Sequence, residues 1–365
     1  MNARMFRAAV VGSLLAPWLM CAGDGPAPLT ATVSGEVLRL SWTGVGTLEA
    51  APTVSGPWTP VAVSSPQTLD LVGRHRYFRR VSPGGPAPPE TPDYGYDLTA
   101  AEGGEFESPP APLEPPPSAT VDLTLLPPVG RQGTEQNPGA PGSCAAWSST
   151  YGLATFTAAR RVNQAPTNAT QWASPAAIFV QVLQLEQQAS NTCAGSRITS
   201  YFQVLAQGGT PSLADAPYVP SCPQLWTNYG GRTLPPDPAF TVSGFRKVAT
   251  TNLTFIKRVL ASGGALAYAT GLYTDWSSYR GQPVPYVGNG VPARKKDGGL
   301  VGHCMLIIGY DDTRNAMLIQ NSEGSDWGGT ISGAPPGPEG TDAGYVWMDY
   351  TTFQRLAQGE AFYVP

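Results

Sequence analysis

The sequence predicts an α+β protein in which a small all-β module precedes a larger domain. Hydrophobic residues recur at helical spacing through the first half of the larger domain, whereas short apolar runs separated by turn residues fill its second half. Helices and strands segregated in this way are typical of α+β architecture. The 42 Gly and 38 Pro among 365 residues add many turns, which excludes a helical bundle or a coiled coil.

The first 23 residues have the layout of a secretory signal peptide. Arg4 and Arg7 precede an uncharged apolar stretch over residues 8–20, and small residues follow it. A stretch of about 13 residues is too short for a membrane span, which needs roughly 20. No later stretch is long and apolar enough, so we expect a secreted, periplasmic or cell-surface protein without a membrane span. A lipid anchor at Cys21 remains an alternative.

Residues 28–82 are predicted to form the small β module. Leu38, Leu40 and Trp42 alternate with polar residues, which is the pattern of a half-buried strand; the alternative is a spacer. Residues 83–118 hold 11 Pro and no basic residue, so we expect an extended, acidic linker there. The larger domain then occupies residues 119–365.

Capping and breaking residues set the expected elements of the larger domain. Ser174 and Pro175 are a typical N-cap and first-turn pair, and Gly208 and Gly209 end another helix. Helices are therefore expected over residues 144–160, 175–185, 198–207 and 252–262. Strands are expected over residues 265–273, 304–310, 317–320, 344–350 and 361–364.

Charge and histidine content exclude several classes of function. The formal charge is −4 and there is no long basic run, so no nucleic-acid partner is expected. The two histidines are His75, which lies among arginines, and His303. Because a zinc site needs several His or Cys ligands and no CxxC pair is present, no metal is expected. Phosphate-binding and dinucleotide motifs are also missing, so no cofactor is expected, and we expect a monomer.

Cys144 is the candidate nucleophile. A Gly/Pro-rich loop over residues 137–143 leads into a helix that begins at this cysteine. The free N–H groups and the dipole at a helix N-terminus favour a thiolate, which is the nucleophilic form. The alternative is a small buried hydrophobic residue.

His303 and Asn321 are the candidate partners of this thiol. His303 enters an apolar strand, and Asn321 comes just after the next strand. An Asn oxygen that accepts from one imidazole nitrogen holds the tautomer and leaves the other nitrogen for the thiol. Upstream, the Gln132 amide and the Cys144 backbone N–H together provide two donors for an oxyanion hole. Gln136 is an alternative donor closer to the cysteine. Asp311 and Asp312 allow a Cys-His-Asp alternative, although their position after a turn favours solvated loop acids.

Four short motifs occur along residues 121–365 in the order Gln, Cys, His and Asn. They are Gln132-Gly133, Gly142-Ser143-Cys144, Gly302-His303-Cys304, and the run from Asn321 to Gly328. With these motifs in this order, the region resembles the papain-like cysteine peptidases of the cathepsin type, in a bacterial exported form.

The resemblance implies a fold and a set of roles. The fold has a helical lobe that carries the nucleophile and a β-barrel-like lobe that carries His and Asn, with the cleft between them. The activity is hydrolysis of a peptide or protein through a thioester. Cys144 is the nucleophile, His303 the base and then the acid, Asn321 the orienting residue and Gln132 the oxyanion donor. The residues expected along the substrate cleft are Gly195, Ser196, Gly302 and Trp327.

The cysteine pairing follows from the resemblance. Cys144 must stay free to react, and Cys304 is expected to point to the face of its strand opposite His303 as a buried thiol. Cys193 and Cys222 are then expected to form the disulfide, since both lie in loop-rich sequence as the bridged turn of the family does.

The chain also departs from the family pattern. The spacing from Gln132 to Cys144 is longer than usual, and Ala145 replaces a Trp. Glu323 replaces the aromatic that shields the Asn, so a wetter His–Asn hydrogen bond is expected. Ser196 replaces a Gly that pairs with substrate, which puts backbone pairing in doubt. Residues 28–118 do not have the composition of a helical inhibitory pro-segment.

Three functions are compatible with these features. The first is an exported cysteine endopeptidase. The second is a weak or inactive protein that binds peptides on the same scaffold, with Ala145, Ser196 and Glu323 marking a decayed site. The third is an acyl or peptidyl transferase that passes the same thioester to an amine.

Overall fold

The computed structural model divides the chain into two compact units, Met1–Pro89 and Glu90–Pro365. In the first unit it describes only strands. In the second unit it describes residues 94–96, 114–133, 140–279, 284–295, 298–328, 344–356 and 359–365.

The described residues of the first unit form two antiparallel sheets. One sheet has the order β1-β7-β4-β5 and the other β2-β3-β6. The strand β1 lies in the predicted signal peptide and pairs with β7, while Cys21 and His75 lie outside the described residues. The strands are β1 (Met5–Arg7), β2 (Thr30–Ser34), β3 (Val37–Ser41), β4 (Thr47–Ala51), β5 (Thr59–Ala62), β6 (Gln67–Asp70) and β7 (Tyr77–Val81).

Helices dominate the first half of the second unit. The longest helical stretch joins α1 (Cys144–Ala146), the π-helical segment η2 (Trp147–Ala154) and α2 (Thr155–Val162), and it ends where Asn163 adopts a left-handed conformation. Ser174 caps α3 (Pro175–Leu185) by accepting from Ala176 N. Two further helices are α4 (Ile198–Gly208) and α5 (Cys222–Tyr229), and short 3₁₀ turns are η1 (Leu123–Leu125), η3 (Pro238–Phe240) and η4 (Trp276–Ser278).

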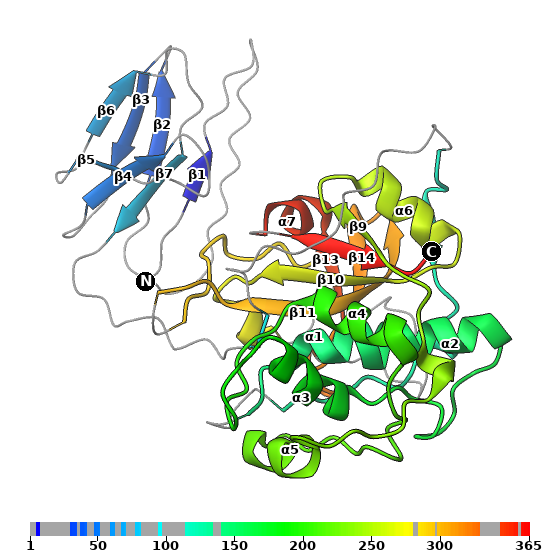
Figure 1. Ribbon diagram of the computed structural model, residues 1–365. Coiled ribbons are helices and arrows are strands. Elements are labelled where there is room, and N and C mark those ends of the chain that lie inside the picture. The colour runs from blue at the N-terminus through cyan, green and yellow to red at the C-terminus, as the bar shows by residue number, and fades with distance from the viewer. Residues whose placement is uncertain are drawn as a thin grey trace. The chain divides into compact units, whose positions relative to one another are not determined.

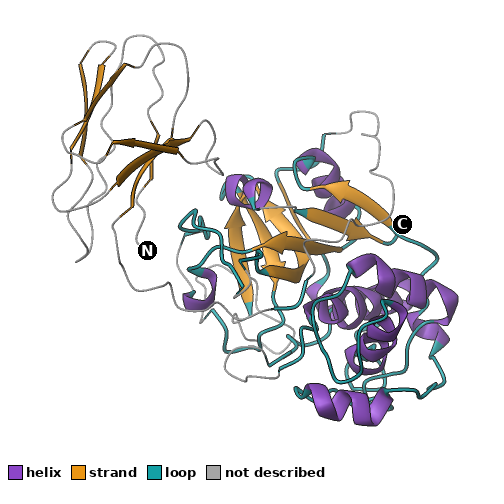
Figure 2. Cartoon of the chain, turned by 60° about the vertical axis from the view of Figure 1, so that its left-hand side comes forward, coloured by secondary structure: helices purple, strands orange, loops and turns teal. Residues whose placement is uncertain are grey.

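An antiparallel sheet forms the second half of the unit. Its order is β13-β12-β11-β10-β14-β9, with β8 paired to β11. Figure 2 shows α1 to α5 gathered on one side of the unit and the sheet on the other. The strands are β8 (Ser118–Thr120), β9 (Arg246–Ala249), β10 (Leu266–Gly271), β11 (Gly302–Asp311), β12 (Ala316–Gln320), β13 (Tyr345–Asp349) and β14 (Glu360–Tyr363). The α+β prediction is confirmed.

The sequence analysis did not predict two of the helices, α5 and α7. α5 begins at Cys222 with Pro223 in its first turn, and its eight residues are too few for a clear periodic pattern. α7 (Tyr350–Arg355) follows β13 directly, because the Asp349 carboxylate caps the N–H groups of Thr351 and Thr352. Together with α6 (Leu253–Ala261), α7 lies beside the sheet (Figure 1).

The helical stretch and the sheet meet at the nucleophile. α1 and η2 both contact β11, and the whole of β11 up to Tyr310 is buried. The register of the sheet pairs Gln320, the last residue of β12, with Leu306 of β11. Asn321 therefore follows β12 at the level where β11 begins, which brings it beside His303.

Three residues inside the predicted linker are buried in the second unit. Tyr94 and Tyr96 are 1% and 2% exposed and belong to its hydrophobic core. Residues 94–96 of the expected linker are therefore extended but packed into the second unit. The average composition of the segment conceals two aromatic rings that bury enough apolar area to order a short stretch.

Among the described residues, none of the helices has the length and hydropathy needed to cross a membrane.

Candidate active site

Cys144 lies at the first position of α1 and is fully buried. Its sulfur is not in a disulfide. The preceding residue, Ser143, is not a side-chain cap, so the first N–H groups of the helix remain available for other acceptors. The helix passes into π-helical turns at Trp147, a local irregularity that is frequent at functional sites.

The pKa of the Cys144 thiol is lowered to about 6. Burial alone raises this pKa because it disfavours the charged form. Hydrogen bonds from Cys304 and His303, together with the charge of His303, outweigh burial and favour the thiolate. In return, the pKa of His303 is raised: burial lowers it, but contact with the Cys144 sulfur and the charge of Glu323 raise it more. The two groups therefore stabilise each other as an ion pair.

His303 is held by Asn321. The ring Nε2 lies 2.7 Å from Asn321 Oδ1, and the same oxygen accepts from Ser322 N at 2.8 Å. The Asn321 N–H in turn donates to Gly344 O at 2.8 Å. With the amide oxygen fixed as an acceptor, Nε2 carries its proton and Nδ1 is the nitrogen that exchanges a proton with the sulfur.

The expectation of a wet His–Asn hydrogen bond is wrong. His303 is fully buried and Asn321 is 3% exposed. Rings from separate segments surround them: Tyr94 lies 4.4 Å from the imidazole and Trp276 lies 6.3 Å from it, centroid to centroid, and Trp327 packs on Trp276 at 4.9 Å. Tyr94 and Trp276 thus come from distant segments to shield a site that position 323 does not shield, and local sequence comparison cannot reveal such contacts.

Gln132 is fully buried in a loop bound to the Asn321 loop. Its N–H donates to Ser322 O at 2.8 Å, and its Oε1 accepts from Ser322 Oγ at 3.2 Å. This second bond orients the amide with Nε2 as the donor end. The alternative, Gln136, lies outside the described residues.

Glu323 is a buried carboxylate that the sequence interpretation counted only as a departure. It is 1% exposed, and its backbone pairs with Arg131. Its charge raises the pKa of His303. The acid therefore acts in favour of the ion pair.

Cys304 lies closer to the nucleophile than expected. It is a buried free thiol, as expected, but it hydrogen bonds with Cys144 through both side chain and backbone. This contact is possible because α1, which begins at Cys144, packs on β11.

Asp311 and Asp312 belong to a turn and not to the site. Asp311 accepts from Thr313 N at 2.8 Å, and Asp312 binds Lys257 Nζ at 2.5 Å. These local partners exclude the Cys-His-Asp alternative.

A segment of the chain itself lies across the site. The N–H of Cys144 donates to Tyr94 O at 3.4 Å, and Ser196 N donates to Gly95 O at 2.9 Å. Tyr96 N donates to Gly302 O at 3.3 Å. Ser196 and Gly302, both expected along the cleft, thus pair with an extended backbone of this chain from both sides.

Only glycine fits at the middle of this segment. Gly95 has φ +98°, and a Cβ there would overlap the backbone of Gly142. A Cβ on Gly195 would lie 2.6 Å from Gly95 O. The stretch that lies across the site is therefore short and extended, and its backbone bonds to that of Cys144.

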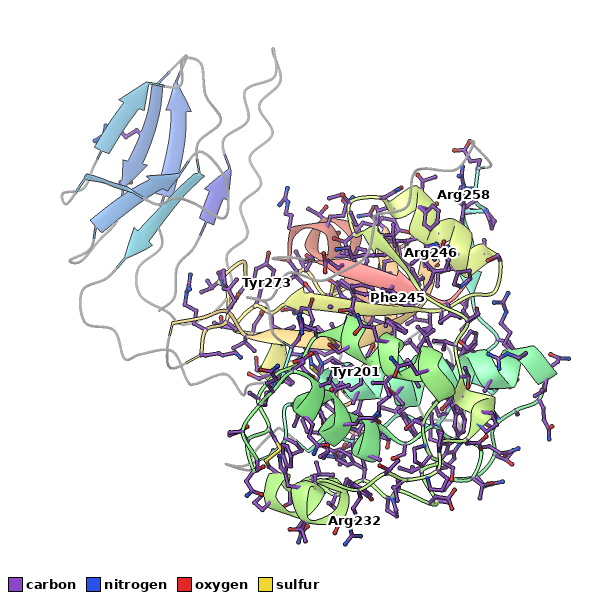
Figure 3. The ribbon with its side chains drawn as sticks, in the orientation of Figure 1. Tyr201, Arg232, Phe245, Arg246, Arg258 and Tyr273 are labelled. Atoms are coloured by element: carbon purple, nitrogen blue, oxygen red, sulfur yellow. A yellow bond between two sulfur atoms is a disulfide. The ribbon has the colours of Figure 1, made fainter. Side chains whose placement is uncertain are left out.

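The Cys193–Cys222 disulfide ties this side of the cleft to α5. The two Cα atoms are 5.8 Å apart, and the bond is drawn in yellow in Figure 3. Cys193 O accepts from Gly142 N at 2.9 Å. Tyr201, labelled in Figure 3, comes from α4, and its hydroxyl lies 2.6 Å from Ser196 Oγ. These bonds fix the turn that faces the Tyr94–Tyr96 segment.

Comparison with known families agrees with this geometry. The model of the papain family cysteine proteases matches residues 134–331, more than half of the chain. This chain belongs to the papain family of cysteine proteases. It is therefore a cysteine peptidase, a hydrolase that acts on proteins or peptides. No curated protein matches the chain.

Among solved structures, xylellain supports the same fold, and two others are similar to parts of this chain. Xylellain, a cysteine protease from Xylella fastidiosa, is 23% identical with a TM-score of 0.53, over 75% of this chain and 96% of that one. Procathepsin L2 from the larval midgut of Tenebrio molitor is 22% identical with a TM-score of 0.49, over 69% of each chain. A Carica candamarcensis cysteine protease in complex with E-64 is 17% identical with a TM-score of 0.42, over 68% of this chain and 98% of that one.

Proposed function

We propose that this papain-family protein is an exported cysteine endopeptidase of the cathepsin type that forms a thioester on Cys144. The observation that supports this most is the buried relay in which His303 stands between the Cys144 sulfur and Asn321. Its 2.7 Å bond to Asn321 and the lowered pKa of Cys144 are what a thiolate–imidazolium pair needs.

The proposed reaction starts with the thiolate of Cys144. It attacks the carbonyl carbon of the scissile bond, and the carbonyl π electrons move onto the oxygen. When the tetrahedral adduct collapses, His303 gives its Nδ1 proton to the leaving amine and the C–N bond breaks. Water then attacks the thioester while His303 accepts its proton, and the thiolate leaves as the acid is released. General acid–base catalysis of this kind contributes roughly 10²–10⁴-fold to the rate.

The oxygen of the adduct has two candidate donors. These are the Cys144 N–H and the Gln132 amide. The Cys144 N–H already faces a peptide carbonyl, that of Tyr94, at 3.4 Å. A chain carbonyl at this place supports the assignment, because an oxyanion hole must accept the carbonyl oxygen of a bound peptide.

We propose that the Tyr94–Tyr96 segment keeps the peptidase covered until it is displaced. The segment uses the backbone groups of Ser196 and Gly302 that an extended substrate would use. A substrate therefore competes with the segment for the same hydrogen bonds. Such direct competition lowers the apparent affinity of the substrate in proportion to the open fraction.

Labelling of the full chain with iodoacetamide tests the proposal. We expect Cys144 to be labelled at least tenfold faster than Cys304 at pH 6.5, because thiolate content controls the rate. Peptide mapping by mass spectrometry reads both cysteines in one sample. A fluorogenic peptide assay of the wild type and of Cys144→Ala is the companion measurement, and only the wild type should hydrolyse the peptide.

The alternative functions give different results in the same assays. Equally slow labelling of both thiols with retained peptide affinity would indicate a binding protein on this scaffold, for which the complete burial of Cys144 is the favouring observation. Product that partitions toward an added amine would indicate an acyl transferase. Export is tested by sequencing the N-terminus of the secreted chain, which we expect to start after residue 23.

A further inference from the structure

We infer that Tyr218 is a positioning residue that sets the separation of the two oxyanion donors. Its hydroxyl bonds to the segment that carries Gln132 and to the segment that carries Cys144. The inference rests on the proposed hydrolytic function, and it adds a residue that touches neither substrate nor the reacting atoms.

The contacts of the Tyr218 hydroxyl reach both segments at once. It donates to Gln132 O at 3.0 Å, and it lies 2.7 Å from the Oγ of Ser143, the residue before the nucleophile. With its own proton given to Gln132, the hydroxyl accepts the proton of Ser143. Burial raises the pKa of Tyr218 well above its usual value, so the hydroxyl keeps its proton and remains a donor at working pH.

The chain between the two donors cannot set their separation by itself. Eleven residues lie between Gln132 and Cys144, a spacing longer than the family pattern. The number of conformations of a connection grows with its length, whereas an oxyanion donor is effective only at about 2.7–3.1 Å from the oxygen. The two hydrogen bonds of the Tyr218 hydroxyl act as a brace between Gln132 and Ser143. With this brace, the separation of the two donors does not depend on the conformation of the connecting residues.

The Tyr218 side chain is itself held firmly. Its ring packs edge-on against Trp147 at 4.9 Å between centroids. The residues before it are bonded on two sides: Ser174 Oγ donates to Ala216 O at 2.5 Å, and the Tyr229 hydroxyl donates to Pro217 O at 2.6 Å.

The loop that carries Gln132 packs against the same segment. Gly133 has φ +83°, and a Cβ there would lie 2.6 Å from Pro220 Cβ. The segment over residues 216–220 is thus a fixed support for both sides of the proposed oxyanion hole.

The test compares Tyr218→Phe with Tyr151→Phe in the full chain. Tyr151 is a matched control, because its ring packs on the same Trp147 at 4.8 Å and its hydroxyl donates to a backbone oxygen, that of Pro128, at 2.9 Å. Both variants lose one hydroxyl and keep the ring, but the Tyr218 hydroxyl bonds to Gln132 itself and to the residue before Cys144, whereas the Tyr151 hydroxyl bonds four residues before Gln132.

Two probes separate positioning from general loss of structure. Iodoacetamide alkylates the thiolate without forming an oxyanion, whereas a peptide aldehyde forms a tetrahedral adduct whose oxygen occupies the oxyanion position. We expect Tyr218→Phe to weaken aldehyde binding and lower kcat about tenfold, with KM and the alkylation rate within about twofold of the wild type. Tyr151→Phe should leave all four within about twofold. The Tyr94–Tyr96 segment competes with the aldehyde and the substrate in the wild type and in both variants, so its effect cancels when the three proteins are compared.

Several results would overturn the inference. One is an equal loss of aldehyde binding and alkylation in Tyr218→Phe, which indicates a structural role; another is no change in either. If Tyr218→Phe does not fold, Ser143→Ala removes the other half of the brace and should weaken aldehyde binding about threefold without slowing alkylation. If the wild type binds the aldehyde but hydrolyses no peptide, the proposed function is contradicted. Aldehyde binding and alkylation can still be compared between Tyr218→Phe and Tyr151→Phe in that case. A wild type that binds no aldehyde refutes both.

Discussion

The two sides of the candidate site are stabilised by different parts of the structure. His303 and Asn321 come from β11 and the end of β12, and sheet register brings them together. Cys144 lies at the start of α1 and Gln132 in a loop bonded to Ser322, and Tyr218 bonds beside both residues. The register of the sheet therefore positions the base, while the nucleophile side combines the start of a helix with loops from several parts of the chain. Changes on the sheet side should affect proton transfer, and changes on the loop side should affect access and geometry.

The largest effect is expected from His303→Ala. Without the imidazole, the pKa of Cys144 rises from about 6 toward the ordinary thiol value of about 8.5. Alkylation of Cys144 at pH 6.5 should fall by about two orders of magnitude, and peptide hydrolysis should be lost. A pH profile of alkylation from pH 5 to 9 measures the shift. If the midpoint of the alkylation profile were unchanged, His303 would not be the base that lowers the pKa of Cys144.

Gly95→Ala tests the segment that covers the loop side. The substitution puts a Cβ into the Gly142 backbone at a positive φ, and such strain is worth roughly 1–3 kcal/mol. The segment should leave the cleft, so alkylation of Cys144 in the full chain should speed up about tenfold. Gly231→Ala is the control, since it also has a positive φ but no atom lies within 4 Å of its Cβ position. Equal rates in both variants and the wild type would contradict the covering role.

Glu323→Gln tests electrostatic support of the imidazolium. The Glu323 charge raises the pKa of His303, so its removal lowers that pKa. The ion pair exists above the pKa of Cys144 and below that of His303, and the alkaline limit of kcat/KM should therefore move to lower pH by about half a unit. The acid limit should change less. A shift of the alkaline limit to higher pH would show that Glu323 has the opposite effect.

Ser196→Gly is expected to have the smallest effect. Ser196 pairs with the covering segment through its backbone N–H, which glycine retains. KM should stay within about threefold of the wild type, although loss of the 2.6 Å bond to Tyr201 should lower the free energy of unfolding by about 1 kcal/mol. A large rise in KM would show that the serine side chain itself contacts substrate.

The sequence was most informative where chemistry depends on a few residue types. With His303 as the single histidine of the larger domain, its role could be predicted without any structure. The start of a helix at Cys144 and the α+β order of the elements could also be predicted from the sequence alone. The shielding of the His303–Asn321 bond was not, because Trp276 and Tyr94 are brought to the site from two distant segments.

Local patterns by themselves determined the elements of this protein, its candidate nucleophile, base and orienting residue, and its family. Only the tertiary structure decided that Tyr94–Tyr96 bonds to the backbone of Cys144, that Cys304 contacts the thiol, and that Tyr218 joins the two donor segments. The physical reason is that helix, strand and motif signals arise from neighbours in sequence, whereas these three features are contacts between residues far apart along the chain. Such contacts depend on packing and register, which a single sequence does not display.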